Sequence, residues 1–369
     1  MKKSWIPTQP LSGSTFQDYF SLLRTNKFDI APKYLSRVLY TSLVSALATT
    51  PLSKFEKALR QKSIEEHSIA QAPVFIIGHW RSGTTFLHYL MSKDTNFGYL
   101  SNAQAFCPGY MFYHLPKLIK KIIGLHLPCK RPMDDIKITL DNPQEEEFAL
   151  VNMSGQSCYH WWTFPKKMKE YFEKYVLLKN LTAQEYQQFK QTYLSLMKKT
   201  SLVNTSKRLL IKNPVNTGRI PLLLELFPNA QFIYLHREPL EVYHSTLKLH
   251  TKLLECFSFQ HFDRKEIEQN TITFHQKLLQ KYEQDKLLIP SINLVEIDFK
   301  SLTTAPLEIS KHIYNSLNIP DFENAFNAFK YFVDTQKNYQ KDTYITNPVL
   351  EKALLNTIMQ YKNELKTAI

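Results

Sequence analysis

The sequence lacks any apolar stretch close to the roughly 18 to 20 residues that a membrane-spanning helix requires. Its first residues, MKKSWIP, lead into polar sequence and not into the hydrophobic core of a signal peptide. We therefore expect a cytoplasmic protein whose contact with a membrane, if it makes one, is peripheral and on the inner face.

Cysteine is scarce as well, and the sequence contains no Cys-x-x-Cys pair and no Cys/His cluster. That absence argues against a structural zinc site, and widely spaced cysteines are typical of free thiols in a reducing compartment. No metal is implied. The four cysteines are Cys107, Cys129, Cys158 and Cys256.

Acidic residues are few relative to basic ones, 33 against 46, which gives a formal net charge of +13. Such an excess favours an anionic partner. The sequence has no zinc finger, RNP-type aromatic motif or arginine-rich arm, so we expect no nucleic-acid partner. A polyanionic cofactor and an anionic membrane face fit the spread of lysines better, and a lysine-rich surface that only aids solubility is the alternative.

What the sequence does contain is an alternation of helical and strand patterns. Residues 10–70 show helical spacing, and four short apolar runs at 74–77, 209–211, 232–235 and 294–297 read as buried strands with helical segments between them. This alternation predicts an α/β fold with a P-loop-like parallel sheet flanked by helices.

We expect one domain across the whole chain, residues 1–369, built from four parts. A helical extension covers 1–70, and the α/β core covers 73–99 and 206–318. A large helical insertion, 100–205, follows the first strand-helix unit and covers the site at the carboxyl ends of the strands. A helical segment, 319–369, ends the chain.

The first apolar run leads directly into the turn GHWRSGTT and then into a helical pattern. Gly78 and Gly83 let the backbone curl around an anion, and the helix N-terminus that follows presents unpaired N–H groups. The spacing of the two glycines matches the GxxxxG of a P-loop. Thr84 and Thr85 replace the Lys-Ser/Thr of that motif, and the nearest cation is Arg81. The turn therefore suits a shorter anion than a nucleoside triphosphate.

A second anion site is predicted at the third apolar run, within FPNAQFIYLHREPLEVYHST. Arg237 follows the strand, and Ser245 lies on the helix that Pro239 starts, so that both can converge on one phosphate. Lys212, in LLIKNP, ends the second run and is directed at the same crevice. Two anion sites at neighbouring strand ends suggest a nucleotide with phosphates at both ends.

Together these three motifs resemble the sulfotransferases that use 3′-phosphoadenosine 5′-phosphosulfate (PAPS), and the resemblance covers residues 73–318. It implies that Arg237 and Ser245 bind the 3′-phosphate and that Lys212 lies near the transferring sulfonate. The segment 131–150 resembles a bacterial branch that includes an enzyme sulfating a lipidic quinone alcohol. The resemblance implies that the 5′-phosphosulfate is held by Arg81, Ser82, Gly83, Thr84 and Thr85.

Sulfonate transfer is an in-line displacement in which charge builds on the bridging oxygen of the departing bisphosphate, so positioning and charge stabilisation dominate. Arg81, Lys212 and the N–H groups of the loop would supply that stabilisation without a metal. A general base must still take the proton of the acceptor.

The base is where the sequence departs from the family pattern. Many members carry a glutamate some distance after the loop, or a histidine after the second-strand lysine, and neither is found here. Our first choice is Glu145, in a run that begins a predicted helix, followed by Glu147. Carboxylates in a first helical turn also interact favourably with the helix dipole, so a capping role is the alternative. His160 is the reserve candidate, although a histidine among aromatics is more often packed.

The acceptor is expected to be a small or lipidic alcohol. Residues 114–128, HLPKLIKKIIGLHLP, form an apolar stripe with lysines beside it, which is typical of a helix on an anionic membrane surface. Docking onto the protein's own core explains the stripe equally well. Trp161, Trp162 and Phe164 fit the lining of an apolar pocket.

Two other functions fit parts of the pattern. A P-loop kinase for a small molecule would use the glycine-bracketed turn, but the lysine after Gly83 and a metal-binding aspartate at a strand end are missing. A non-catalytic, membrane-associated nucleotide-binding module would account for the missing family glutamate.

Overall fold

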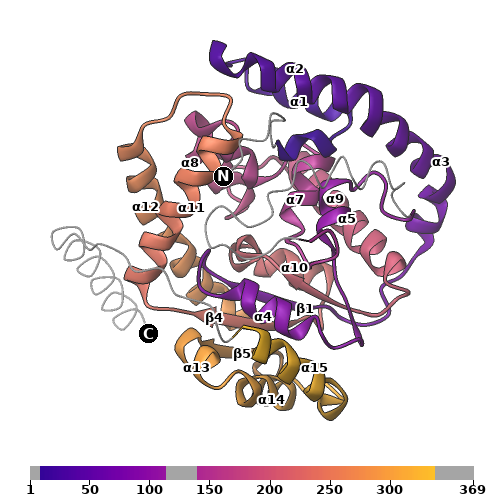
Figure 1. Ribbon diagram of the computed structural model, residues 1–369, viewed down its shortest axis with the longest axis vertical. Helices are drawn as coiled ribbons and strands as arrows, with labels where there is room; N and C mark the ends of the chain where they lie inside the picture. The colour runs from indigo at the N-terminus through magenta and orange to yellow at the C-terminus, as the bar shows by residue number, and fades with distance from the viewer. Residues whose placement is uncertain (1–8, 114–138, 337–369) are drawn as a thin grey trace.

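The computed structural model describes residues 9–113 and 139–336 of the chain. Within them, a 5-stranded sheet has the order β2-β3-β1-β4-β5, and every neighbouring pair is parallel (Figure 1). The predicted α/β class and the four predicted strands are confirmed, whereas β2 was missed because two residues leave no pattern. The strands are β1 Val74–Gly78, β2 Phe97–Gly98, β3 Arg208–Lys212, β4 Gln231–His236 and β5 Leu294–Asp298.

Strand β1 lies at the centre of the sheet, between β3 and β4. Ile76 lies opposite Lys212 of β3, and Gly78 lies opposite Leu235 of β4. Because the strands are parallel, their carboxyl ends meet at one edge of the sheet. That edge brings together the turn after Gly78, Lys212, and Arg237 just beyond β4.

Successive residues of β1 point to opposite faces of the sheet, and both faces are covered. Val74 and Ile76 belong to one buried core, and Phe75 and Ile77 belong to the other. Figure 1 shows α13, α14 and α15 on one side of the sheet, below the strands. The helices of the sheet region are α4 Thr84–Met91, α10 Ile220–Leu226, α11 Pro239–Phe257, α12 Arg264–Asp285, α13 Phe299–Thr304, α14 Pro306–Ser316 and α15 Phe322–Thr335.

The predicted insertion between the first strand-helix unit and β3 is helical and rich in buried aromatics. Its helices are α5 Asn102–Phe106, α7 Glu147–Met153, α8 Met168–Tyr175 and α9 Ala183–Val203, with a 3-10 helix at Cys158–Trp162. Helix α7 begins at Glu147, so Glu145 lies before the helix and not in its first turn as the sequence suggests. The carboxyl groups of residues 145–147 are directed into the protein interior and form side-chain hydrogen bonds there, and Glu145 lies in the turn before the helix.

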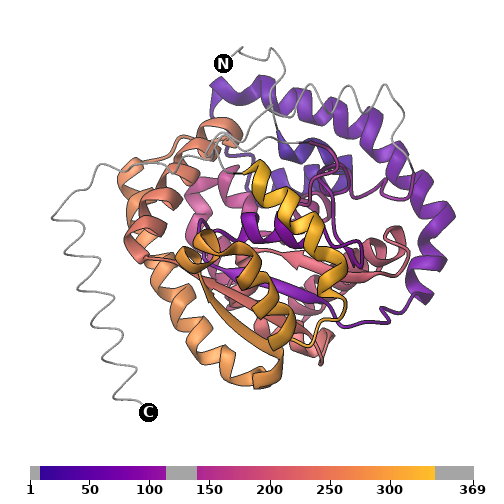
Figure 2. The ribbon, with the colours of Figure 1, turned by 60° about the horizontal axis from the view of Figure 1, so that its bottom comes forward.

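The helices expected within 10–70 are α1 Phe16–Thr25, α2 Leu35–Val44 and α3 Thr50–Glu66. A π-helical turn, Ser45–Thr49, joins α2 to α3 without a break. Figure 2 shows that α2 and α3 run along the outer edge of the molecule.

None of the described helices is both long and apolar enough to cross a bilayer. The amphipathic helix predicted over 114–128 lies outside the described residues, as does Cys129. Cys107, Cys158 and Cys256 are free thiols, as the sequence suggests.

Candidate active site

The turn after β1 has the backbone of an anion-binding loop. Gly78 and Gly83 have positive φ angles of 144° and 100°, and Arg81, between them, has a φ of 70°. Glycine adopts such angles without strain, while arginine does so at a cost. Helix α4 starts at Thr84, directly after this turn, so the N–H groups at its N-terminus lie at the loop.

Ser82 adds an independent indication of a ligand. Its hydroxyl oxygen is buried and has no hydrogen-bond partner among the described residues. Buried polar atoms in folded proteins are nearly always paired, so an unpaired hydroxyl at a helix N-terminus fits an anion that is bound during function.

Both glycines are also required by close packing. A Cβ atom on Gly78 would lie 2.4 Å from the carbonyl oxygen of Leu235, and one on Gly83 would lie 2.2 Å from the ring of Phe299. The loop is therefore fixed in position by β4 on one side and by the residue after β5 on the other.

The predicted 5′ and 3′ sites meet through side chains from three elements. The Nε group of Arg81 donates a hydrogen bond to Ser245 Oγ on α11 at 2.8 Å, and Arg237 Nη1 donates to the carbonyl oxygen of Arg81 at 3.0 Å. The guanidinium carbon of Arg237 lies 4.3 Å from the ring centroid of Phe299, and its Nη2 pairs with Glu241 at 2.5 Å. The fold thus gathers the two arginines and the serine at one place.

Lys212 at the end of β3 connects the loop to the glutamate run. Its ammonium group donates to Thr85 Oγ1 at 3.3 Å and to Glu145 Oε1 at 2.5 Å. The second carboxylate oxygen of Glu145 accepts a hydrogen bond from the hydroxyl of Tyr159, whose oxygen also accepts one from Trp80 Nε1 at 3.3 Å. A carboxylate, a cation and the loop therefore lie in direct contact.

Glu147 occupies a different position, in a buried ion pair with Arg219 at 2.7 Å. Its carboxylate also accepts hydrogen bonds from Ser157 Oγ, the Cys158 amide and Asn213 Nδ2. Burial alone would raise the pKa of Glu147, but the charge of Arg219 and these hydrogen bonds outweigh burial and lower that pKa. Every lone-pair direction of this carboxylate has a donor nearby.

His160 lies inside the insertion, with its side chain fully buried. Burial lowers its pKa to about 4, although the hydrogen bond between Nε2 and the carbonyl oxygen of Ser154, 3.0 Å long, opposes that shift. The imidazole is thus neutral at neutral pH and is held by the backbone. Trp161, Trp162 and Phe164 are buried as well, within the aromatic core.

Sequence reasoning missed three residues of the site. Tyr159 holds Glu145, Arg219 holds Glu147, and the hydroxyl of Thr217 donates to the carbonyl oxygen of Gly78 at 2.9 Å and lies 2.8 Å from its amide. Each acts through a tertiary contact, and the residues that it joins lie between 14 and 139 positions apart in the chain. No local spacing signals such a contact.

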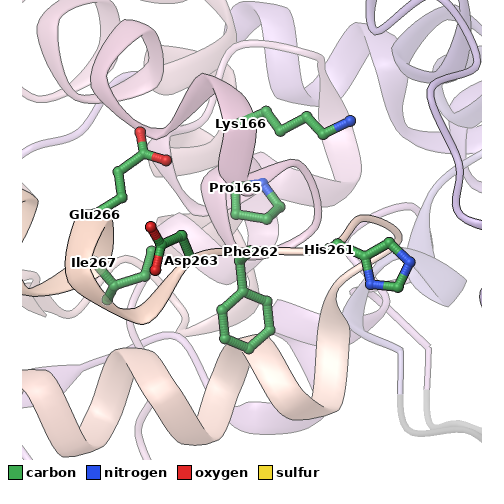
Figure 3. Close-up of a pocket in the computed structure, with 7 residues that line it drawn as sticks. All are labelled: Pro165, Lys166, His261, Phe262, Asp263, Glu266 and Ile267. Carbon is green, nitrogen blue, oxygen red and sulfur yellow. The ribbon is translucent and has the colours of Figure 1, made fainter.

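A surface pocket of about 370 Å³ lies at the start of α12 and does not include the loop (Figure 3). Because none of the predicted site residues lines it, we place the candidate active site at the strand ends. The residues that line this surface pocket are Pro165, Lys166, His261, Phe262, Asp263, Glu266 and Ile267.

The central parallel strand, the glycine-bracketed turn and the basic residues at the strand ends define an α/β enzyme with a P-loop-like site. A model of the sulfotransferase family matches residues 73–324, more than half of the chain. The chain belongs to the sulfotransferase family, and its activity is sulfonate transfer. The resemblance of the three motifs is thereby confirmed.

Two relatives share 27% identity with the chain over 333 residues, 90% of this chain and 84% of theirs. Both are named omega-hydroxy-beta-dihydromenaquinone-9 sulfotransferase Stf3, one from Mycobacterium bovis and one from Mycobacterium tuberculosis. They act on a lipid-like quinone alcohol, according to that name.

Solved structures confirm the fold. Sulfotransferase STF9 from Mycobacterium avium aligns with a TM-score of 0.66 at 15% identity, over 95% of this chain and 96% of that one. Sulfotransferase STF1 from Mycobacterium tuberculosis aligns with a TM-score of 0.56 at 15% identity, over 85% and 86% of the two chains.

We predict that Glu147→Ala destabilises the protein strongly, because it leaves the guanidinium of Arg219 buried without its partner. The expected loss in the free energy of unfolding is about 3–5 kcal/mol. Urea denaturation measures it. Glu66→Ala, which breaks an exposed pair with Lys62, serves as the control and should cost no more than about 1 kcal/mol. Equal losses in the two variants would contradict the assigned role of the buried pair.

We also predict that Gly83→Ala destabilises the protein by roughly 1–3 kcal/mol, because alanine is strained at this φ and its methyl group meets Phe299. The matched control is Gly155→Ala, since a Cβ there has no atom within 4 Å. Thermal unfolding of both variants tests the prediction, and a Gly83→Ala variant as stable as the control would show that the loop tolerates a side chain.

Proposed function

We propose that the chain transfers the sulfonate of PAPS to the hydroxyl of an apolar alcohol, with Glu145 as the general base. The observation that carries this proposal is the contact of Lys212 with both Glu145 and Thr85, which lies in the first turn of α4 directly after the loop. It places a carboxylate that can accept a proton beside the cation and loop that would hold the transferring group.

For the donor, the loop supplies backbone N–H groups, the unpaired Ser82 hydroxyl and the Arg81 side chain. PAPS, when bound, supplies the activated sulfonate. Arg237 and Ser245 are our candidates for its 3′-phosphate, because Arg81 contacts both of them and so ties the two phosphate sites together. The residues that we assign to the 5′ end are Arg81, Ser82, Gly83, Thr84 and Thr85.

We propose that Glu145 accepts the proton of the acceptor hydroxyl, because it is the carboxylate that contacts Lys212. A negative group at the loop competes with Glu145 for the ammonium of Lys212. That competition leaves one carboxylate oxygen for the acceptor hydroxyl, while Tyr159 holds the other oxygen in place. Lys212 and Arg81 then stabilise the charge that develops on the leaving oxygen.

We assign structural roles to the other two candidates for the base. Glu147 has its oxygens engaged by Arg219 and by the segment around Ser157. His160 is held against Ser154 by its ring nitrogen. Neither contact involves the loop.

For the acceptor, the two Stf3 relatives supply the chemical class, a lipid-like quinone alcohol. Phe148 and Trp162 pack on the ring of Tyr159, with centroids 5.1 and 4.2 Å away, so the base lies next to aromatic side chains. An apolar alcohol suits such surroundings. Membership of the sulfotransferase family does not favour the kinase or the non-catalytic module.

We predict that Glu145→Gln lowers the turnover number with an apolar alcohol by about 10²–10⁴-fold, because the amide cannot accept the proton. Binding of adenosine 3′,5′-bisphosphate should change little, as calorimetry would show. Glu66→Gln, an exposed change, is the control. Unchanged turnover in Glu145→Gln would move the role of base to Glu147 or His160.

We predict that Arg237→Ala lowers the affinity for adenosine 3′,5′-bisphosphate by about 10–100-fold, as expected for the loss of a charge-assisted contact to phosphate. The affinity for adenosine 5′-phosphate should stay nearly constant, because that ligand lacks the 3′-phosphate. Arg24→Ala, at an exposed position on α1, is the matched control.

Thermal shift with the wild-type protein separates the donor from a kinase substrate. The bisphosphate should raise the melting temperature without added metal, whereas ATP with Mg²⁺ should have little effect. If Arg237→Ala lowered the affinities for adenosine 3′,5′-bisphosphate and adenosine 5′-phosphate equally, this arginine would lie outside the 3′ site.

A further inference from the structure

The helix formed by α2, the π turn and α3 exposes a continuous series of large apolar side chains. They recur every four residues, with one exposed proline in the series, and the exposed fractions of the leucines and the phenylalanine lie between 51 and 76%. An α-helix turns 400° over four residues, so the series winds gradually around the exposed part of the helix. We call this surface the leucine face; it consists of Leu35, Leu39, Leu43, Leu47, Pro51, Phe55 and Leu59.

Buried residues of the same helix fix it to the protein. Glu56 is buried in an ion pair with Lys199 of α9 and accepts hydrogen bonds from the amides of Met111 and Phe112, at 2.5 and 3.0 Å. Thr49 Oγ1 donates to the carbonyl oxygen of Ser12 at 2.8 Å. These contacts set the rotation of the helix, so the leucine face is directed outward along the molecular edge seen in Figure 2.

Charges around the leucine face are mostly positive. Between positions 33 and 62 the sequence has six basic residues and one acidic residue, and that acid is the buried Glu56. Exposed carboxylates follow at the end of α3, at Glu65 and Glu66, and Glu66 pairs with Lys62. The basic residues are Lys33, Arg37, Lys54, Lys57, Arg60 and Lys62.

Helix α1 extends the apolar surface. Phe16, Phe20 and Phe28 are 40 to 48% exposed, and the amide of Phe16 donates to Thr50 Oγ1 at the start of α3 at 2.8 Å. The rings of Phe16 and Phe20 stack with centroids 6.0 Å apart. Exposed aromatic and leucine side chains beside lysine and arginine are the composition of helices that lie in a membrane interface.

We propose that the leucine face docks the enzyme on an anionic phospholipid surface. The apolar side chains enter the boundary of the acyl chains, and the six cations meet lipid phosphates. A second copy of the chain fits this face less well. A two-fold contact would place the cations of one face against those of the other, with no exposed carboxylate between positions 33 and 62 to pair them.

This surface differs from the segment 114–128 that the sequence suggests for membrane contact. The docking proposal rests on α1 to α3 alone. It deepens the proposed function, since an apolar alcohol dissolved in a bilayer would reach the enzyme at the surface where the leucine face lies, but its test does not measure sulfonate transfer.

The test is flotation of the full-length protein with phospholipid vesicles. Wild type should bind vesicles of phosphatidylcholine mixed with phosphatidylglycerol, and bind vesicles of phosphatidylcholine alone much less. The triple variant Leu39→Gln, Leu43→Gln and Leu47→Gln should lower the affinity for anionic vesicles by roughly tenfold or more, because it removes the largest apolar contribution. Lys54→Gln with Lys57→Gln should lower it by about fivefold for each cation, and added salt should reduce that difference.

The matched control uses a second group of exposed apolar residues, which follows α12 in the sequence. Leu287, Leu288 and Ile292 are 56 to 81% exposed, and the charges near them are balanced, since Lys281 pairs with Asp285 and Lys286 pairs with Glu283 and Glu296. Their triple replacement by glutamine should leave vesicle binding unchanged. The thermal shift produced by adenosine 3′,5′-bisphosphate is measured on every variant, so that a fault in the fold or the donor site is seen separately.

Two results would overturn the proposal. One is equal vesicle binding by wild type and the leucine variant. The other is a concentration-dependent dimer in analytical ultracentrifugation that the leucine variant abolishes while its vesicle binding persists, which would make the face a contact between two copies.

Discussion

The ammonium group of Lys212 makes the contact on which the site depends, because it joins the phosphate-binding loop to Glu145. Strand register produces this contact: β3 pairs with β1, and Lys212 lies opposite Ile76, shortly before the loop. Glu145 comes from the inserted segment and is held by Tyr159. The proposed catalysis therefore depends on the register of the strands and on one cation shared by the loop region and the base.

The glutamate run shows how burial gives neighbouring residues different chemistry. Glu147 is matched by Arg219, and its pKa is lowered. Burial raises the pKa of Glu146 to about 7, despite hydrogen bonds that include one from Tyr193, so its proton is only loosely retained near neutral pH. Glu145 accepts a hydrogen bond from Lys212 at the end of β3. Because a buried charge without a partner is strongly destabilising, these pairings also fix the start of α7.

The N-terminal helices are anchored to the protein by buried residues and expose apolar side chains to the solvent. One side of α3 is fastened by Glu56 and Lys199, and this contact leaves the leucine face directed outward. An apolar surface of this size, on helices with a mostly positive charge, fits the anionic lipid surface that we propose as its partner. An enzyme of the proposed function would thereby meet its apolar substrate without a membrane-spanning helix.

The sequence alone determined the class of fold and the loop, because buried parallel strands leave continuous apolar runs and because only glycine allows the turn at Gly78 and Gly83. It also singled out Lys212, Arg237 and Ser245, since residues at the ends of parallel strands must meet at one edge. It left three candidates for the base, and it could not foresee Tyr159 or Arg219, whose contacts with the glutamate run are tertiary. Only the tertiary structure decided which carboxylate contacts Lys212 and which is paired with Arg219, because hydrogen bonds and desolvation depend on neighbours that the local pattern does not specify.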